Sequence, residues 1–130
     1  MESSLRELAS YRMERAREML SASADNLHMG QYRTALNRSY YAIFHAMRAA
    51  NILEGYDSSK HSGVIAFFNK TFLKENLMER SLSQIIKESS YLREKSDYDD
   101  FYIASKIEAE LQLNKALSFV REVESYLERH

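Results

Sequence analysis

The chain of 130 residues contains no cysteine and no proline, and it has only three glycines. Without cysteine it can form no disulfide, no thiolate ligand for zinc and no thiol nucleophile. Without proline it lacks the residue that most strongly interrupts helices, which favours long uninterrupted helices. The glycines, Gly30, Gly55 and Gly63, fall at or near the ends of segments with helical periodicity, and we expect each to form a helix stop or a turn.

Long apolar runs are also absent. No stretch approaches the roughly 20 apolar residues that a membrane span needs. The first residues, MESSLRELASYRMERA, are charged and amphipathic rather than signal-like, so we expect no membrane association and a cytoplasmic location. Neither charge predominates: 18 basic and 19 acidic residues leave a net charge of −1, and any polyanion must therefore bind to a local patch.

Length and periodicity indicate a single all-α domain. No linker, repeat or low-complexity tract divides the chain, so we expect residues 1–130 to form one domain. Apolar residues recur at spacings of three and four in five segments: about 4–27, 31–53, 61–76, one beginning near residue 82, and about 101–127. The third segment would in isolation also suit a buried strand, but its neighbours favour a helix. The predicted fold is an up-and-down antiparallel bundle of four or five helices, two of them long.

The second segment carries a polar stripe opposite its apolar one. At about 100° per residue, Arg38, Tyr41, His45 and Arg48 fall within about 80° of one another. Arg38 and His45 lie about 10 Å apart along the helix axis, near enough for arginine to hold a phosphate while histidine moves a proton. Two other interpretations remain open: an ordinary solvated helix face, or a subunit interface, where tyrosine and arginine are enriched.

A second group of polar residues, YLREKSDYDDFY (91–102), follows in the fourth segment and combines Arg93 and Lys95 with Asp97, Asp99 and Asp100. Because no EF-hand spacing is present, we predict that an aspartate caps the fifth helix rather than that these residues bind a metal ion. No phosphate loop, dinucleotide fingerprint or serine elbow occurs, and we expect neither a metal nor a cofactor. We assign no catalytic role to the histidines near segment ends, His28, His61 and His130.

Three segments are similar to a known family: YRTALNRSYYAIFHAMRAA (32–50), SKHSGVIAFFNK (59–70) and YLREKSDYDDFY (91–102). They resemble the small HEPN proteins of bacteria and archaea (higher eukaryote and prokaryote nucleotide-binding domain), and the likeness extends over almost the whole chain. It implies a helical bundle, commonly a homodimer, often encoded beside a small nucleotidyltransferase. Many members are metal-independent RNases in which a histidine helps to activate the ribose 2′-hydroxyl and an arginine stabilises the phosphate.

The motif of these RNases, an arginine followed after four to six residues by a histidine, fits this sequence in two ways. Arg38 and His45, with six residues between them, satisfy it literally, but they lie in the second helix. In the family's toxins the motif lies near the last long helix, which places Arg93 on the arginine and Tyr98 where histidine is expected. Tyrosine, with an unperturbed pKa of about 10, is a poor general base near neutrality, so in this register the catalytic histidine is missing.

Our leading hypothesis is a HEPN-type accessory or binding subunit that dimerises and binds a nucleotide or RNA. The resemblance adds a small nucleotidyltransferase as partner in a toxin-antitoxin-like or defence system. The expected site contains Arg38, His45, Arg93 and Tyr98, with Tyr41, Arg48, Lys95 and Asp97 as further ligand-binding residues. The alternatives are a metal-independent endoribonuclease and a purely structural helical module.

Overall fold

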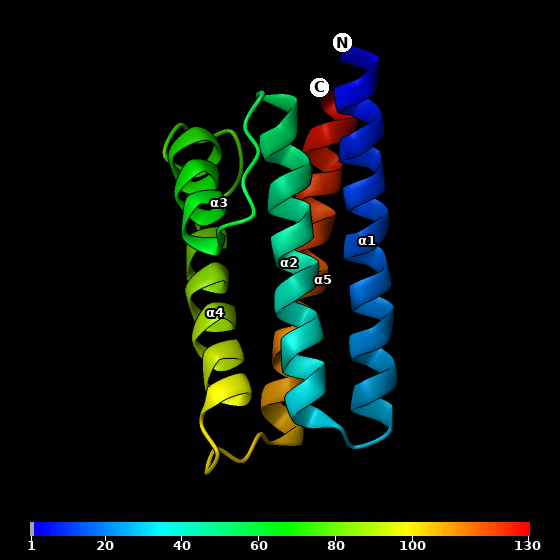
Figure 1. Ribbon diagram of the computed structural model, residues 1–130, viewed down its shortest axis with the longest axis vertical. Helices are drawn as coiled ribbons and strands as arrows, with labels where there is room; N and C mark the ends of the chain where they lie inside the picture. Colours follow the sequence, from blue (N-terminus) through cyan, green and yellow to red (C-terminus); the bar gives the residue numbers. More distant parts are fainter. Residues whose placement is uncertain (1) are drawn as a thin grey trace.

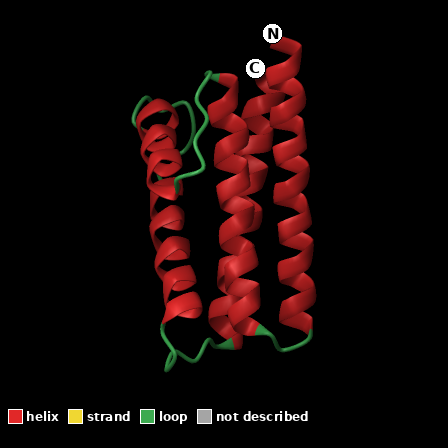
Figure 2. Cartoon of the chain, viewed as in Figure 1, coloured by secondary structure: helices red, strands yellow, loops and turns green. Residues whose placement is uncertain are grey.

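The computed structural model describes residues 2–130, which form an elongated antiparallel bundle of five α-helices with one π-helical turn (Figure 1, Figure 2). Three helices are long: α1 (Glu2–His28), α2 (Tyr32–Leu53) and α5 (Lys106–Arg129). Helix α3 (His61–Phe68) continues into the π-helical turn η1 (Asn69–Leu73), and α4 (Leu82–Tyr98) precedes α5. The two termini lie at the same end of the bundle (Figure 1). The all-α fold predicted from the sequence is confirmed.

Helix α2 occupies the centre of the bundle. It packs against α1 on one side and α4 on the other, with α5 behind it and α3 near its carboxyl end (Figure 1). The apolar side of α2 is buried, as its periodicity predicts, and the largest fully buried side chains include Tyr40, Ile43 and Met47 of this helix. Because three helices cover it, only a strip of α2 between α1 and α4 reaches the surface, and residues of both neighbours flank that strip.

Two of the three glycines have the expected role. Gly30 and Gly55 follow α1 and α2 with φ of +75° and +80°, the left-handed conformation in which glycine ends a helix without strain. Gly63 was predicted wrongly, because it lies within the first turn of α3 and forms no turn of its own. A Cβ atom there would lie 2.8 Å from the Tyr56 hydroxyl, so a larger residue would have to displace the end of the Tyr56 side chain.

The start of α5 differs from the prediction. The helix begins at Lys106 rather than near Phe101, and its cap is Ser105, not an aspartate. The Ser105 hydroxyl accepts a hydrogen bond from the backbone amide of Glu108, and the Glu108 carboxylate accepts one from the backbone amide of Ser105. This reciprocal capping box satisfies two backbone N–H groups at the start of the helix. Asp99 instead follows α4, and its side chain accepts a hydrogen bond from the backbone amide of Phe101. This hydrogen bond stabilises the turn between α4 and the segment that leads to α5.

Candidate functional site

Two polar clusters border the surface strip of α2. The α2–α4 cluster consists of Asn37, Arg38, Tyr40, Tyr41, His61, Arg93 and Asp97. The α1–α2 cluster consists of Arg12, Arg15, His45, Arg48 and Asp57. The structure therefore brings Arg38 together with Arg93, from the two registers of the motif, and places His45 and Arg48 in the other cluster.

Arg93 is the centre of the α2–α4 cluster. Its side chain is only 11% exposed, and its guanidinium lies 4.9 Å from the centre of the Tyr40 ring, in a cation–π contact. Its ion pair with Asp97 is long, at 3.4 Å, and its buried Nε has no hydrogen-bond partner among the described residues. Burial lowers the pKa of Arg93, but the neighbouring Tyr40, Tyr41, Tyr98 and Asp97 raise it overall, so the charge persists. The guanidinium is thus fixed in place while much of its donor capacity is unused.

Asn37 and Asp97 connect Arg38 to Arg93. The Asn37 amide donates to both carboxylate oxygens of Asp97, at 3.2 Å each. The Arg38 guanidinium donates to the Asn37 side-chain oxygen at 2.7 Å, and Arg93 contacts the same Asp97 carboxylate. Arg38 of α2 and Arg93 of α4 therefore belong to one hydrogen-bond network, in which a single carboxylate, that of Asp97, accompanies two permanently charged guanidinium groups.

His61, to which the sequence assigned no role, completes this cluster. Its Nδ1 lies 2.9 Å from the Tyr40 hydroxyl, and its ring centre lies 4.3 Å from that of Phe44 and 5.7 Å from that of Tyr41. Burial and the charge of Arg93 lower the pKa of His61. Periodicity within one helix did not reveal this residue, because 21 positions separate it from Tyr40; the only available signal was its place in the SKHSG segment that carries the resemblance.

The α1–α2 cluster is organised around an acidic residue. Asp57, in the connection between α2 and α3, accepts hydrogen bonds from Arg12 at 3.1 Å and from Arg48 at 2.8 Å. Burial raises the pKa of Asp57, but these two hydrogen bonds and charges lower it overall. Arg12 is 8% exposed, which explains why an arginine interrupts the apolar stripe of α1: it is a buried cation with a partner.

The charges of three arginines, Arg12, Arg15 and Arg48, act on His45. Burial, followed by the charges of Arg15, Arg48 and Arg12, lowers the pKa of His45 to about 4. The imidazole is therefore neutral at pH 7, and the same arginines oppose its protonation. A general base works best when its pKa lies near the operating pH, so His45 in this setting is a weak base.

Tyr41, a member of the α2–α4 cluster, is also a neighbour of His45 in the other cluster. Its ring centre is 6.4 Å from that of His45 and 5.7 Å from that of His61, and Tyr41 is among the groups that raise the pKa of Arg93. The polar stripe that the spacing of α2 predicts thus exists, but it is shared between two environments. Arg38 and His45, two turns apart, form no hydrogen bond with each other and have different neighbours.

Lys95 and Tyr98 have different positions. Lys95 faces away from Arg93 and lies over the rings of Tyr91 and Tyr102, at 5.5 and 5.8 Å. Tyr98 lies beside Arg93 but is 76% exposed. With Tyr91, Lys95 and Phe101 it lines a shallow groove of about 500 Å³ at the end of α4. This groove belongs to an exposed apolar surface, defined here as Tyr91, Tyr98, Phe101, Ile103, Ile107 and Leu111.

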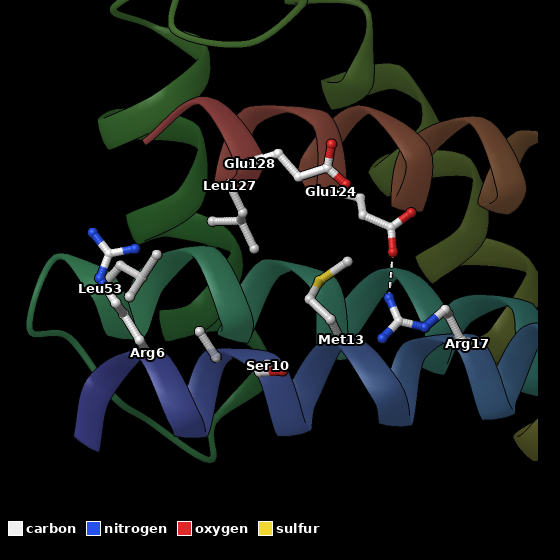
Figure 3. Close-up of a pocket in the computed structure, with 9 residues that line it drawn as sticks. Arg6, Ser10, Met13, Arg17, Leu53, Glu124, Leu127 and Glu128 are labelled. Atoms are coloured by element: carbon white, nitrogen blue, oxygen red, sulfur yellow. Dashed lines mark hydrogen bonds and ion pairs between the residues drawn. The ribbon is translucent and has the colours of Figure 1, made fainter. Parts of the chain in front are cut away.

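A separate groove of about 450 Å³ lies between α1 and α5 (Figure 3). Arg6, Met13 and Leu127 line it, and the ion pair of Arg17 with Glu124 closes one side of it (Figure 3). None of the residues predicted for the functional site lines this groove. Its two arginines already have partners within the chain, Arg17 in the Glu124 carboxylate and Arg6 in the His130 carbonyl oxygen, so we do not place the site there.

Two further findings concern metals and membranes. Within residues 2–130, no group of three His, Asp or Glu side chains is placed to hold a metal ion. In the same part of the chain, no helix combines the length and the apolar composition that a membrane crossing requires.

Comparisons with known proteins relate the chain to a family. The sequence model of the HEPN domain matches residues 9–129. A Methanocaldococcus jannaschii protein named "Putative toxin" is 33% identical over 115 residues, which cover 88% of this chain and 78% of that protein. A Thermotoga maritima protein named "UPF0332 protein" is 30% identical over 118 residues, which cover 91% of this chain and 89% of that protein. The crystal structure of TT1696 from Thermus thermophilus shares the fold, with a TM-score of 0.77 and 21% identity over 91% of this chain and 97% of that one.

Proposed function

Because this chain belongs to the HEPN family, we propose that it is a toxin-like protein that binds the phosphate groups of RNA through Arg93 and Arg38 of the α2–α4 cluster. The observation that carries this proposal is the state of Arg93. Its guanidinium is nearly buried and lies over Tyr40, and its ion pair with Asp97 is long, at 3.4 Å. Arginine in this state matches the geometry of a phosphate group, which accepts two parallel N–H hydrogen bonds.

The first experiment measures the affinity of purified protein for a short fluorescein-labelled single-stranded RNA by fluorescence anisotropy, with EDTA present. We expect Arg93→Gln to weaken binding about tenfold or more, since a hydrogen bond between charged groups contributes about 1.5–3 kcal/mol. Arg121→Gln, at an exposed position on α5, is the matched control and should leave the affinity unchanged. Competition with AMP shows whether a mononucleotide satisfies the same site. Equal affinities of both variants and the wild type would contradict the role of Arg93, and a wild type that binds no RNA would favour a purely structural module.

We propose a second copy of the chain as the occupant of the exposed apolar surface. Phe101 is 93% and Ile103 87% exposed, and Tyr91 joins the groove at the end of α4 to a second one lined by Leu111. Large apolar side chains with exposures this high are typical of homodimer interfaces. Tyr98 belongs to this surface and also lies beside Arg93, so a dimer formed here has its two phosphate sites near the interface.

Analytical ultracentrifugation tests the dimer. The wild type should sediment as a dimer, and Ile107→Lys, which places a charge in the proposed interface, should sediment as a monomer with an unchanged circular dichroism spectrum. Lys106→Ala, one residue earlier on the same helix, is the control. A monomeric wild type would contradict this part of the proposal.

The protein partner that we propose is a small nucleotidyltransferase, in a toxin-antitoxin-like or defence system. The support is the family and a relative whose name includes the word toxin. Co-purification from cells that express both proteins is the test, with Ile107→Lys and Arg93→Gln locating the contact. Failure of the two proteins to associate would remove the partner and leave the RNA-binding proposal standing.

A metal-independent endoribonuclease is the second candidate. The observation that favours it is the neutral imidazole of His45, a prerequisite for accepting a proton, and the one against it is the ring of arginines that makes this imidazole a weak base. Incubating the protein with labelled mixed-sequence RNA in the presence of EDTA decides between an endoribonuclease and a binding subunit. Cleavage by the wild type that is lost in Arg38→Ala and His45→Ala supports the enzyme, whereas cleavage that persists in both rules out this motif. An inert wild type favours a binding subunit.

A further inference from the structure

His61 and Arg93 approach the same buried side chain from elements far apart in the sequence. Tyr40 is fully buried, its hydroxyl lies 2.9 Å from His61 Nδ1, and the Arg93 guanidinium lies 4.9 Å from the centre of its ring. The His61 ring is only partly buried, packed on Phe44 and facing Tyr41. Tyr40 therefore contacts both a histidine and an arginine, and the charge of Arg93 acts on His61.

The Tyr40 hydroxyl determines which nitrogen of His61 carries the proton. Burial raises the pKa of Tyr40 to about 12, so the phenol keeps its proton at neutral pH. A buried hydroxyl needs an acceptor within the protein, and the contact found for it is His61 Nδ1. If Nδ1 carried the imidazole proton, the hydroxyl proton would lose that acceptor. The hydroxyl therefore donates to Nδ1, and the imidazole proton lies on Nε2.

The surroundings of His61 also keep its ring uncharged. The titratable groups that face it are Tyr40 and Tyr41 of α2 and Arg93 of α4, and none of these carries a negative charge at pH 7. His61 is the first residue of α3, where the helix dipole disfavours a cation. A neutral ring with its proton on Nε2 has no free lone pair there, so Nε2 can donate a hydrogen bond but cannot act as a base.

We propose that His61 Nε2 donates a hydrogen bond to an oxygen of the phosphate that Arg93 binds, and that Tyr40 is the positioning residue that fixes this tautomer. The inference rests on the proposed function, because its ligand is the same RNA phosphate. It assigns the α2–α4 cluster a histidine from α3, although the linear motif has Tyr98 at the corresponding position. In this site the histidine binds the phosphate and is not a general base.

Three substitutions at His61 test the donor. The amide nitrogen of glutamine takes the place of Nε2, whereas that of asparagine takes the place of Nδ1. With the labelled single-stranded RNA, His61→Ala and His61→Asn should each weaken binding about tenfold, the size expected for one hydrogen bond to a charged oxygen. His61→Gln should bind within about twofold of the wild type, because it restores a donor at the position of Nε2. Thermal unfolding followed by circular dichroism verifies that all three variants fold.

The tautomer is tested directly by the nitrogen resonances of the histidine rings. In a long-range ¹H–¹⁵N correlation spectrum at pH 7, the wild type should show His61 with protonated Nε2 and unprotonated, hydrogen-bonded Nδ1. Tyr40→Phe should shift the Nδ1 resonance towards that of a nitrogen without a hydrogen bond, while Tyr41→Phe, the neighbouring control, should leave it in place. A proton on Nδ1 in the wild type would overturn the role of Tyr40.

The outcomes separate this inference from the function on which it rests. A wild type that binds no RNA contradicts both. A wild type that binds RNA and loses affinity in Arg93→Gln but not in His61→Ala or His61→Asn contradicts only the inference. Loss of affinity in His61→Gln equal to that in His61→Ala would also overturn it, because a donor at the position of Nε2 would then not be sufficient.

Discussion

The two clusters beside α2 contain similar residue types but differ in how their charges are compensated. In the α1–α2 cluster, Asp57 accepts hydrogen bonds of 3.1 and 2.8 Å from Arg12 and Arg48, and His45 is enclosed by the arginines. In the α2–α4 cluster, the ion pair of Arg93 with Asp97 is longer, at 3.4 Å, and His61 contacts the neutral hydroxyl of Tyr40. The acidic group of the first cluster therefore holds two arginines by close ion pairs, whereas the ion pair of Arg93 in the second is long; a buried Nε without a partner among the described residues occurs in both clusters, at Arg48 and at Arg93.

This difference shows why a motif match is not enough to locate a site. Arg38 and His45 satisfy the arginine-histidine spacing literally, but the two side chains have different neighbours. Arg93 and His61 fit no linear spacing, yet both contact Tyr40. The proximity that phosphate binding requires is a property of the fold, and α2 provides it by presenting side chains to α1 and α4 at once.

The largest expected effect comes from removing the arginines of one cluster at a time. Arg38→Gln combined with Arg93→Gln should weaken RNA binding about a hundredfold, because two charged contacts to phosphate are lost. Arg15→Gln combined with Arg48→Gln should change it less than about threefold, because those side chains already pair with Glu18 and Asp57. Anisotropy at one fixed salt concentration measures both. Equal losses would show that the clusters do not differ in function.

The two aspartates should differ in the property they affect most: Asp57 the stability, and Asp97 the binding of RNA. Asp57→Asn should lower the free energy of unfolding by about 2 kcal/mol, because it leaves the nearly buried Arg12 without its partner. Asp97→Asn should lower it by less than about 0.5 kcal/mol and should strengthen RNA binding, because Arg93 loses its competing carboxylate. Urea denaturation and anisotropy are the two measurements. An Asp97→Asn variant that binds RNA more weakly would place this carboxylate among the ligand-binding groups.

The smallest effect concerns the pH dependence of His45. The pKa of His45 is about 4 in the folded protein, against an ordinary value of 6.5, so the unfolded chain binds more protons between these values. The lowered pKa of His45 therefore contributes to the stability of the folded protein: this contribution is complete above about pH 6.5 and is lost as the pH falls towards 4. Allowing for solvent screening of a partly exposed ring, this contribution amounts to about 1 kcal/mol. The difference in unfolding free energy between the wild type and His45→Gln should change by this amount from pH 7 to pH 4, and a constant difference would contradict the role of the arginines.

Features set by local geometry were predictable from the sequence. The period of α2 identified both its buried side and its polar stripe, because residues three and four apart share one face of a helix. The stops at Gly30 and Gly55 followed from the conformational freedom of glycine. The all-α bundle follows from these local rules and is confirmed.

Features that depend on distant or competing contacts were not predictable. The aspartate cap was wrong because Ser105 and Glu108 form a complete capping box closer to the helix. The apolar residues Ile107 and Leu111 indicated a helix correctly, but periodicity does not reveal that another apolar side, with Leu113 and Val120, is the one that faces the core. His61 was missed because only the packing of α3 against α2 brings it to Tyr40.

The most direct test of where phosphate binds uses the two histidines as reporters. The ring resonances of His45 and His61, identified by comparison with His45→Gln and His61→Gln, are followed at pH 7 while a short single-stranded RNA is added. We predict that the His61 resonances shift and saturate while those of His45 remain in place. Saturating shifts of His45 with an unaffected His61 would contradict the account and assign the phosphate to the α1–α2 cluster.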